Sequence, residues 1–283
     1  MALYLCGKTY LQTLKNLTLK YLVMRKTILL FCAVLLLCSC TPHESPVIED
    51  DQGRGIILNT TVINLSVGNT WQIDASSETA ITYQSGDPFI ARVSVTGLVA
   101  ANHVGSTSVR LDNGNEIKDI TVHVNPVYNL YPDPVLDFGI TRTALVQKLG
   151  APYKETDAGI SYYNYSTAAP YVIYLFDENN RLEFTAVIVK TEYTTPLASH
   201  LDERYLYYGT DGDYYYFINA MTMDEASMGI VLSLDNVDFW QVMYLPFTET
   251  KSATIKNYRR MTSKINAFLI NLALNELYSE KAD

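Results

Sequence analysis

The residues of this chain that could do chemistry are few, and they do not gather in one segment. His200, near Asp202 and Glu203, is the one histidine that could belong to a ligand cluster on a helix. Acidic residues are common in the first turn of a helix, where they favour the helix dipole, so we expect a solvated helix start there rather than a metal site. The remaining histidines fall in separate predicted segments: His43, His103 and His123. Motifs of serine hydrolases, zinc proteases and phosphate-binding loops are missing from the sequence. We therefore expect a protein that is not an enzyme and has no cofactor.

Two acidic stretches, Asp177-Glu178-Asn179-Asn180 and Asp211-Gly212-Asp213, superficially suggest calcium ligands. A calcium loop of the helix–loop–helix type needs further ligands and a distal glutamate at a fixed spacing, and neither stretch continues in that way. Asp, Asn and Gly are also the preferred residues of tight turns. We interpret both stretches as hairpin turns and expect no metal.

Cysteine chemistry is confined to the start of the chain. Arg25 and Lys26 precede an apolar run, Ile28–Leu37, which is short for a membrane span but typical of a secretory signal peptide. The run ends in Leu37-Cys38-Ser39-Cys40, which resembles the bacterial lipobox. This resemblance implies cleavage before Cys40 and acylation of Cys40 with diacylglycerol and palmitate-type chains, which together give stable membrane anchoring. Translation could begin at Met1 or at Met24, and both starts give the same mature protein.

Removal of the leader, residues 1–39, takes away five basic residues and no acid, so the formal charge changes from −9 to −14. A surface this acidic repels nucleic acid, which we exclude as a partner. No cysteine follows Cys40, so neither a disulfide nor a thiol-dependent site is expected in the exported part. The lipid predicts a cell-envelope address, that of an outer-membrane lipoprotein.

Residues 40–55 predict a flexible tether, because prolines and acidic residues dominate and apolar residues are few. In some lipoproteins of Gram-negative gut bacteria, acidic residues shortly after the acylated cysteine accompany export to the outer face. The acidic residues 49–51 resemble that pattern loosely, and a plain spacer explains them equally well. Surface and periplasmic orientations both remain open.

Residues 56–126 predict a small β-sandwich. Apolar and polar residues alternate in short segments, as around Trp71 and Ile73, and turn residues such as Gly68-Asn69, a hairpin-type turn, interrupt them. Further strands are expected at 81–83, 91–93, 98–100, 107–111 and 117–124. Seven or so strands in this length are typical of a sandwich.

The same region resembles bacterial Ig-like domains of group 2. The resemblance lies in four stretches that follow the family's order and spacing: Leu58–Thr61, Leu65–Ile73, Ser85–Val93 and Thr96–Thr107. It implies an all-β Ig-like sandwich of the kind that serves as a spacer or adhesion unit, without a particular ligand. Physically, Asp87-Pro88 should initiate a turn, and Gly97 and Gly105 should occupy positive-φ positions.

Residues 127–283 predict an α+β domain, a duplicated unit of one helix plus antiparallel strands. The first unit has a helix capped by Thr141 and strands at 160–165, 171–176 and 182–189. In the second, a helix begins at Thr195-Pro196 or at a capping box of Ser199 and Asp202 and ends near Tyr208-Gly209; strands follow at 214–219, 229–234 and 239–245. The stretch Ala144–Pro152 resembles the small lipoproteins of outer-membrane assembly, and the duplication resembles β-lactamase-inhibitor proteins.

The chain ends in an amphipathic helix, predicted over 250–278. Ile255, Tyr258, Met261, Ile265 and Phe268 recur at intervals of three and four residues. The helix is expected to cover one face of the preceding sheet, and a partner-binding or coiled-coil role is the alternative.

Tyrosine is abundant, with 22 residues, and clusters in the last domain. Exposed tyrosines suit protein or glycan recognition, although tyrosine is also simply a good strand former. Tyr207, Tyr208, Tyr214 and Tyr216 are the candidate ligand-binding residues, with Tyr215 on the opposite face from Tyr214 and Tyr216. We expect a non-enzymatic, lipid-anchored envelope protein whose Ig-like module presents a domain that binds a glycan or an envelope protein. The alternative is a periplasmic inhibitor or envelope-assembly scaffold.

Overall fold

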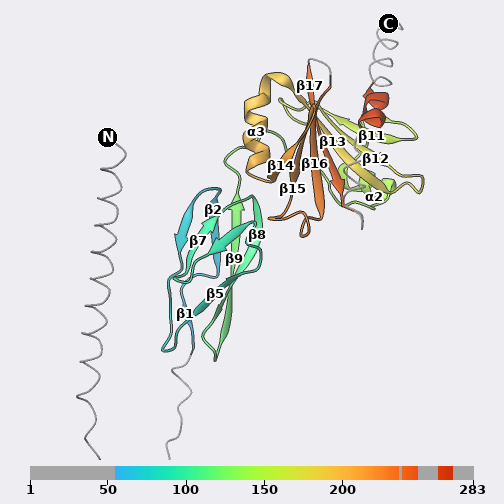
Figure 1. Ribbon diagram of the computed structural model, residues 1–283. Helices are drawn as coiled ribbons and strands as arrows, with labels where there is room; N and C mark the ends of the chain where they lie inside the picture. Colours follow the sequence, from blue (N-terminus) through green and yellow to red (C-terminus); the bar gives the residue numbers. More distant parts are fainter. Residues whose placement is uncertain (1–54, 236–237, 248–260, 270–283) are drawn as a thin grey trace, which may run out of the picture. The chain divides into compact units, whose positions relative to one another are not determined.

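The computed structural model describes residues 55–235, 238–247 and 261–269 (Figure 1). The predicted leader, the predicted acylation site Cys40 and the predicted tether up to residue 54 lie outside the described residues. Contacts divide the chain into units 1–50 and 51–283, and all described residues belong to the second. That unit is predominantly β-sheet with few helices.

The first group of strands lies between residues 57 and 125 and forms a β-sandwich. Its strands are β1 (Ile57–Leu58), β2 (Val62–Ser66), β3 (Thr70–Gln72), β4 (Ala75–Ser76), β5 (Thr82–Ser85), β6 (Ala91–Val93), β7 (Leu98–Ala101), β8 (Gly105–Asp112) and β9 (Ile117–Asn125). One sheet has the order β2-β9-β8-β5 and another the order β3-β7-β6, while β1 pairs with β4. Every pair is antiparallel except β2–β9, which is parallel.

The core of the sandwich comes from the alternation in the sequence. Alternate residues of β8 and β9 face inward, so Val109, Leu111, Ile120 and Val122 are fully buried between the sheets. Apolar burial on this scale, about 25 cal/mol per Å² of apolar surface, is the main stabilising term for a domain without disulfides.

The turns of the sandwich confirm two predictions and overturn one. Asp87 caps its turn by accepting from the Phe89 N–H at 2.9 Å, and Gly97 and Gly105 have φ of 81° and 153°. The prediction of a hairpin at Gly68-Asn69 was wrong. The turn is present, with Gly68 at φ 83°, but β2 before it and β3 after it belong to different sheets. A tight turn can lead a chain from one sheet of a sandwich to the other, because turn chemistry fixes direction and not pairing.

The second group of strands forms one antiparallel sheet of eight. Its order is β10-β11-β12-β13-β17-β16-β15-β14. The strands are β10 (Lys154–Glu155), β11 (Gly159–Tyr163), β12 (Tyr171–Phe176), β13 (Leu182–Lys190), β14 (Leu206–Asp211), β15 (Tyr214–Ile218), β16 (Met228–Asp235) and β17 (Phe239–Pro246). Helix α2 (Arg142–Leu149) precedes the first four strands, and helix α3 (Thr194–Asp202), entered through a 3₁₀ turn at Thr191–Tyr193, precedes the last four.

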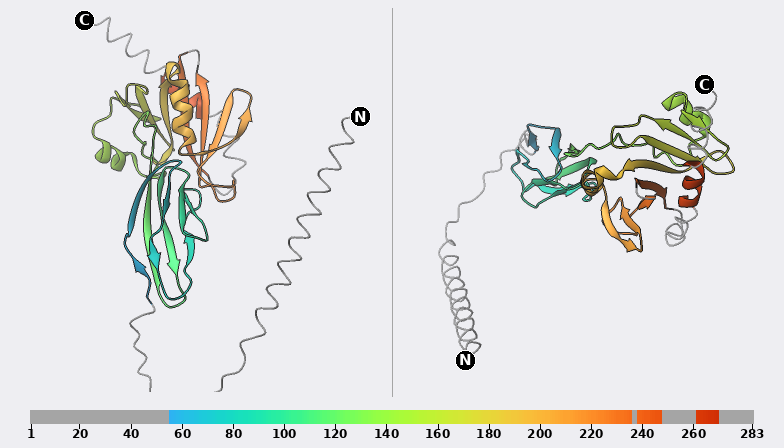
Figure 2. Two further views of the ribbon diagram at one scale, coloured as in Figure 1. Left: turned by 90° about the vertical axis from the view of Figure 1, so that its left-hand side faces the viewer. Right: turned by 90° about the horizontal axis from the view of Figure 1, so that it is seen from above.

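Different helices pack on the two faces of this sheet. On one face, α2 contributes Leu145 and α3 contributes Leu197 and Leu201 to a core with the strands. On the other face, the helical segment 261–269 inserts Met261, Ile265 and Phe268. Figure 2 shows α3 and the 261–269 segment on different sides of the sheet. The rest of the predicted helix 250–278 lies outside the described residues.

Helix ends follow their caps only in part. Thr141 accepts from the Ala144 N–H at 3.3 Å, as predicted, and Gly150 ends α2 at φ 88°. The predicted end of the second helix near Tyr208-Gly209 was wrong, because α3 ends at Asp202 and residues 206–211 form β14. The capping box of Ser199 and Asp202 was also wrong, since α3 begins at Thr194 and no side chain caps it. Tyr207 and Tyr208 are β-formers, and pairing with β15 wins over continuation of the helix.

Both acidic stretches are turns. Asp177 Oδ1 accepts from the N–H groups of Asn179 and Arg181, at 2.9 and 2.8 Å. Gly212 has φ 60° in the hairpin between β14 and β15. No cluster of three or more potential metal ligands occurs among the residues described. Within that same part of the chain, no helix has the length and apolar character needed to cross a bilayer.

Candidate functional site

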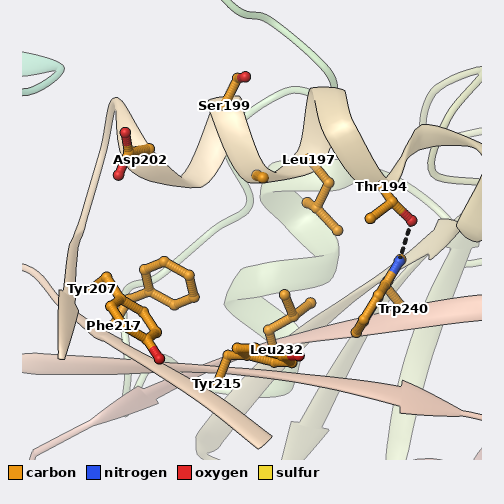
Figure 3. A pocket seen from close by; sticks show the side chains of 10 residues that line it. Thr194, Leu197, Ser199, Asp202, Tyr207, Tyr215, Phe217, Leu232 and Trp240 are labelled. Atoms are coloured by element: carbon orange, nitrogen blue, oxygen red, sulfur yellow. Dashed lines mark hydrogen bonds between the residues drawn. The ribbon is translucent and has the colours of Figure 1, made fainter. Parts of the chain in front are cut away.

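A groove of about 640 Å³ lies between α3 and the outer strands of the eight-stranded sheet (Figure 3). Residues of α3 form one wall, and side chains from β14, β15, β16 and β17 form the opposite wall and the floor. The lining residues are Thr194, Leu197, Ala198, Ser199, Asp202, Tyr207, Tyr215, Phe217, Leu232 and Trp240. Four of them are aromatic, which makes the groove a candidate ligand site.

Trp240 is held in one orientation at the end of the groove where α3 begins. Its indole Nε1 donates to Thr194 Oγ1 at 2.8 Å, and that hydroxyl donates in turn to the Thr191 carbonyl at 2.6 Å (Figure 3). The Tyr215 ring meets the Trp240 ring edge-on, with centroids 6.3 Å apart and planes at 72°. An aromatic ring fixed in this way loses little conformational entropy when a ligand binds.

A second aromatic pair lies at the other end of the groove. Tyr207 of β14 is paired directly with Phe217 of β15, and their rings meet at 68° with centroids 5.5 Å apart. Phe217 is buried in the floor, whereas Tyr207 remains 48% exposed. Tyr215 is 40% exposed, so both ends of the groove offer aromatic surface to solvent.

Strand alternation explains why these residues share a face. Tyr215 and Phe217 are two apart on β15, and their cross-strand neighbours Leu232 and Ile230 on β16 face the same way. Tyr214 and Tyr216 therefore face the opposite side, where they pack with the core that includes the 261–269 segment.

The structure separates the four predicted ligand-binding tyrosines. Tyr207 lines the groove. Tyr208 is 53% exposed and, with Tyr216, lines a much smaller cavity of about 10 Å³, while Tyr214 lies on the same face as Tyr216. Tyr215 had been placed on the opposite face by the alternation rule, and it is the strand's exposed tyrosine in the groove.

Sequence reasoning missed Tyr215, Phe217 and Trp240 as site residues. The alternation of β15 was a usable signal for the first two, but the choice of face required knowing where α3 lies. Trp240 carries no local signal, because it reaches the groove only through the pairing of β16 with β17.

The polar groups of the groove come mainly from α3. Thr194, Ser199 and Asp202 line it from the helix. In Figure 3 the Ser199 hydroxyl points away from the aromatic rings, and Asp202 lies at the end of the groove that holds Tyr207. Asp202 is exposed and is the one charged side chain among the described residues that line the groove. Hydroxyl and carboxylate oxygens beside aromatic faces can accept hydrogen bonds from a ligand that also presents apolar surface.

The last turns of α3 are fastened from behind by buried polar contacts. The Glu203 carboxylate accepts from the N–H groups of Val127 and Tyr128, at 3.0 and 2.9 Å. Arg204 Nε donates to Asp133 Oδ1 at 3.1 Å. These bonds tie the segment that follows β9 to the helix and so fix one wall of the groove.

His200 belongs to this buried support and not to the groove. Its Nδ1 lies 3.4 Å from the Leu130 N–H, and its ring centroid lies 4.2 Å from that of Tyr131. Nε2 has no hydrogen-bond partner among the described residues. Burial, assisted by the Arg204 charge, lowers the pKa of His200 to about 4. The imidazole is therefore neutral at pH 7, and the predicted solvated first turn at this position was wrong.

Comparisons with known proteins do not define a family. No protein-family model matches the sequence, and no curated protein matches it. Among solved structures, domains 5–6 of the S-layer protein SbsC share 16% identity over 70% of this chain and 86% of that one, with a TM-score of 0.22. The C-terminal domain of TagH shares 12% identity over 60% of this chain and 99% of that one, with a TM-score of 0.24.

A third similar structure is SGBP-B from the Bacteroides ovatus mixed-linkage glucan utilization locus, in complex with a mixed-linkage heptasaccharide. It shares 11% identity over 75% of this chain, which spans 46% of that protein, with a TM-score of 0.25. TM-scores and identities at this level do not carry a functional argument, so the function has to be argued from the groove.

Proposed function

We propose that this is a non-enzymatic, lipid-anchored cell-envelope protein that binds a glycan in the groove between α3 and the sheet. The observation that carries the proposal is the pre-set aromatic pair, Tyr215 and Trp240, in a groove that the Asp202 carboxylate also lines. Sugar rings have apolar C–H faces that stack on aromatic rings and hydroxyls that need hydrogen-bond partners. The groove offers both kinds of contact at one place.

The lining of the groove favours binding over hydrolysis. Glycoside hydrolysis generally uses two carboxyl groups on either side of the scissile bond. Asp202 is the one carboxylate among the described lining residues. A single exposed carboxylate can accept hydrogen bonds from sugar hydroxyls but cannot divide the roles of acid and base with a partner.

The order of helices and strands supports an internal duplication of the domain that carries the groove. A helix precedes each set of four strands, and the sets β10–β13 and β14–β17 meet at the central pair β13–β17. We infer that the two halves of this α+β domain are copies, of which the second carries the ligand site. The preceding sandwich, proposed as an Ig-like spacer of bacterial group 2, and the lipid at Cys40 would hold the site away from the membrane.

Calorimetric titration of the mature protein with a panel of oligosaccharides tests the proposal. Trp240→Ala should weaken binding by about 2 kcal/mol, roughly 30-fold, as truncation of an aromatic anchor does. Tyr153→Ala is the matched control, because Tyr153 is 51% exposed and lies outside the groove. Absence of binding by any oligosaccharide, or equal effects of the two substitutions, would refute the proposal.

A protein ligand is the second candidate, and the edge strand β14 favours it. β14 is the last strand of the sheet and carries the exposed Tyr207 and Tyr208, so an extended segment of a partner could pair with it. This is the arrangement expected of a periplasmic inhibitor or assembly scaffold. External protease on intact cells separates the candidates: cleavage supports glycan capture at the surface, and protection supports the periplasmic role.

A further inference from the structure

We propose that the groove selects neutral glycans and rejects those that carry carboxylate, sulfate or phosphate groups. The inference rests on the proposed glycan-binding function and specifies the ligand class of the same site. It is argued from the charges that line and flank the groove.

The groove offers an anion no cationic partner. Proteins bind carboxylate, sulfate and phosphate groups mainly with Arg and Lys, and neither residue occurs among the described residues lining the groove. Lys190, just before the turn that leads into α3, lies 3.9 Å from the Glu192 carboxylate. The indole N–H of Trp240 already donates to Thr194.

The one charge among the described residues that line the groove is negative, that of Asp202. An acidic substituent on a bound sugar would meet this carboxylate without a cation to offset it and would be repelled. The formal charge, −9 for the whole chain and −14 after the predicted removal of residues 1–39, acts in the same direction on approach of the ligand.

A neutral sugar meets the opposite situation. Its hydroxyls are donors, and the exposed Asp202 carboxylate in the lining of the groove is an acceptor for them (Figure 3). Hydrogen bonds to an ionised carboxylate are stronger than those between neutral groups. Asp202 therefore both attracts hydroxyl-rich ligands and repels anionic ones.

The test uses matched pairs of ligands on the full mature protein. Each neutral gluco-, manno-, galacto- or N-acetylglucosamine oligosaccharide is compared with the same oligosaccharide after oxidation of its hydroxymethyl groups to carboxylates. For the pair whose neutral member binds, we expect the oxidised member to bind at least about tenfold more weakly at low salt, with the difference shrinking as salt screens the charges.

Substitution of Asp202 links the discrimination to this residue. Asp202→Asn keeps the size of the side chain and removes its charge, so the ratio of neutral to oxidised affinity should fall severalfold. Glu178→Asn, in the hairpin turn between β12 and β13, is the control for a change in net charge and should leave the ratio unchanged. If the oxidised member bound as tightly as the neutral one or more tightly, and Trp240→Ala abolished that binding, the inference on charge would be wrong while the proposed glycan binding would stand. Failure of every oligosaccharide would overturn the proposed function and this inference together.

Discussion

At the scale of single residues, the buried His200 behind the groove makes the free energy of unfolding depend on pH. The imidazole is buried beside Arg204 and Tyr131, with a folded-state pKa of about 4 against an ordinary value of about 6.5. Between these two values the unfolded chain binds a proton that the folded protein does not. Stability from this residue is therefore complete above about pH 6.5 and is lost as the pH falls towards 4.

We expect the free energy of unfolding to fall by up to about 3 kcal/mol from pH 7 to pH 4 because of His200 alone. His200→Asn keeps an acceptor for the Leu130 N–H but does not titrate, so its stability should depend less steeply on pH. Urea unfolding at pH 7, 6, 5 and 4 measures both slopes. His123→Asn, at a sandwich position paired with Ser106, serves as control. Identical slopes in wild type and His200→Asn would contradict the assignment.

At the scale of elements, the register of β11 against β12 depends on one glycine. A Cβ at Gly159 would lie 2.5 Å from the Leu175 Cδ2 and 2.5 Å from the Tyr174 carbonyl oxygen. The backbone oxygen cannot yield without disturbing the sheet. Two residues further along the same strand, the buried Ser161 hydroxyl has no hydrogen-bond partner among the described residues.

Gly159→Ala should therefore destabilise the protein by more than about 2 kcal/mol, since overpacking against backbone costs this much or more. Ser161→Ala, on the same strand, should be neutral or stabilising because it removes a buried polar group without a partner. Chemical unfolding of both variants provides the measurement. A Gly159→Ala variant as stable as Ser161→Ala would show that the β11–β12 pairing is looser than described.

Elements with strong local signals were predictable from the sequence, and those set by long-range pairing were not. β6 and β12 match their predicted bounds, and Thr141 caps α2 as predicted, because alternation and capping are local properties. The end of α3 was missed because the β14–β15 pairing overrides the sequence at Tyr207. The groove was missed for the same reason: α3, Tyr215 and Trp240 meet only once the sheet has assembled.

At the scale of the whole molecule, the proposed membrane anchoring depends on Cys40. Cys40→Ala should abolish acylation, so the protein should leave the membrane fraction, while the purified chain should keep its oligosaccharide affinity. Fractionation with mass spectrometry of the mature N-terminus measures the first effect, and titration measures the second. An unmodified wild-type chain that retains residues 24–39 would contradict the lipoprotein assignment. Cys38→Ala is the matched control, and we expect this variant to remain acylated.

The strand order also has a consequence for export. The centre of the sheet is the pair β13–β17, and β17 ends at Pro246, late in the chain. In the export that we propose, the N-terminal part of the chain would cross the inner membrane first. β13, most of whose residues are buried in the finished sheet, would then have one unpaired edge until β17 arrives. During that interval the unpaired edge would make the polypeptide prone to aggregation. A periplasmic chaperone that covers the edge would then determine the yield of folded protein.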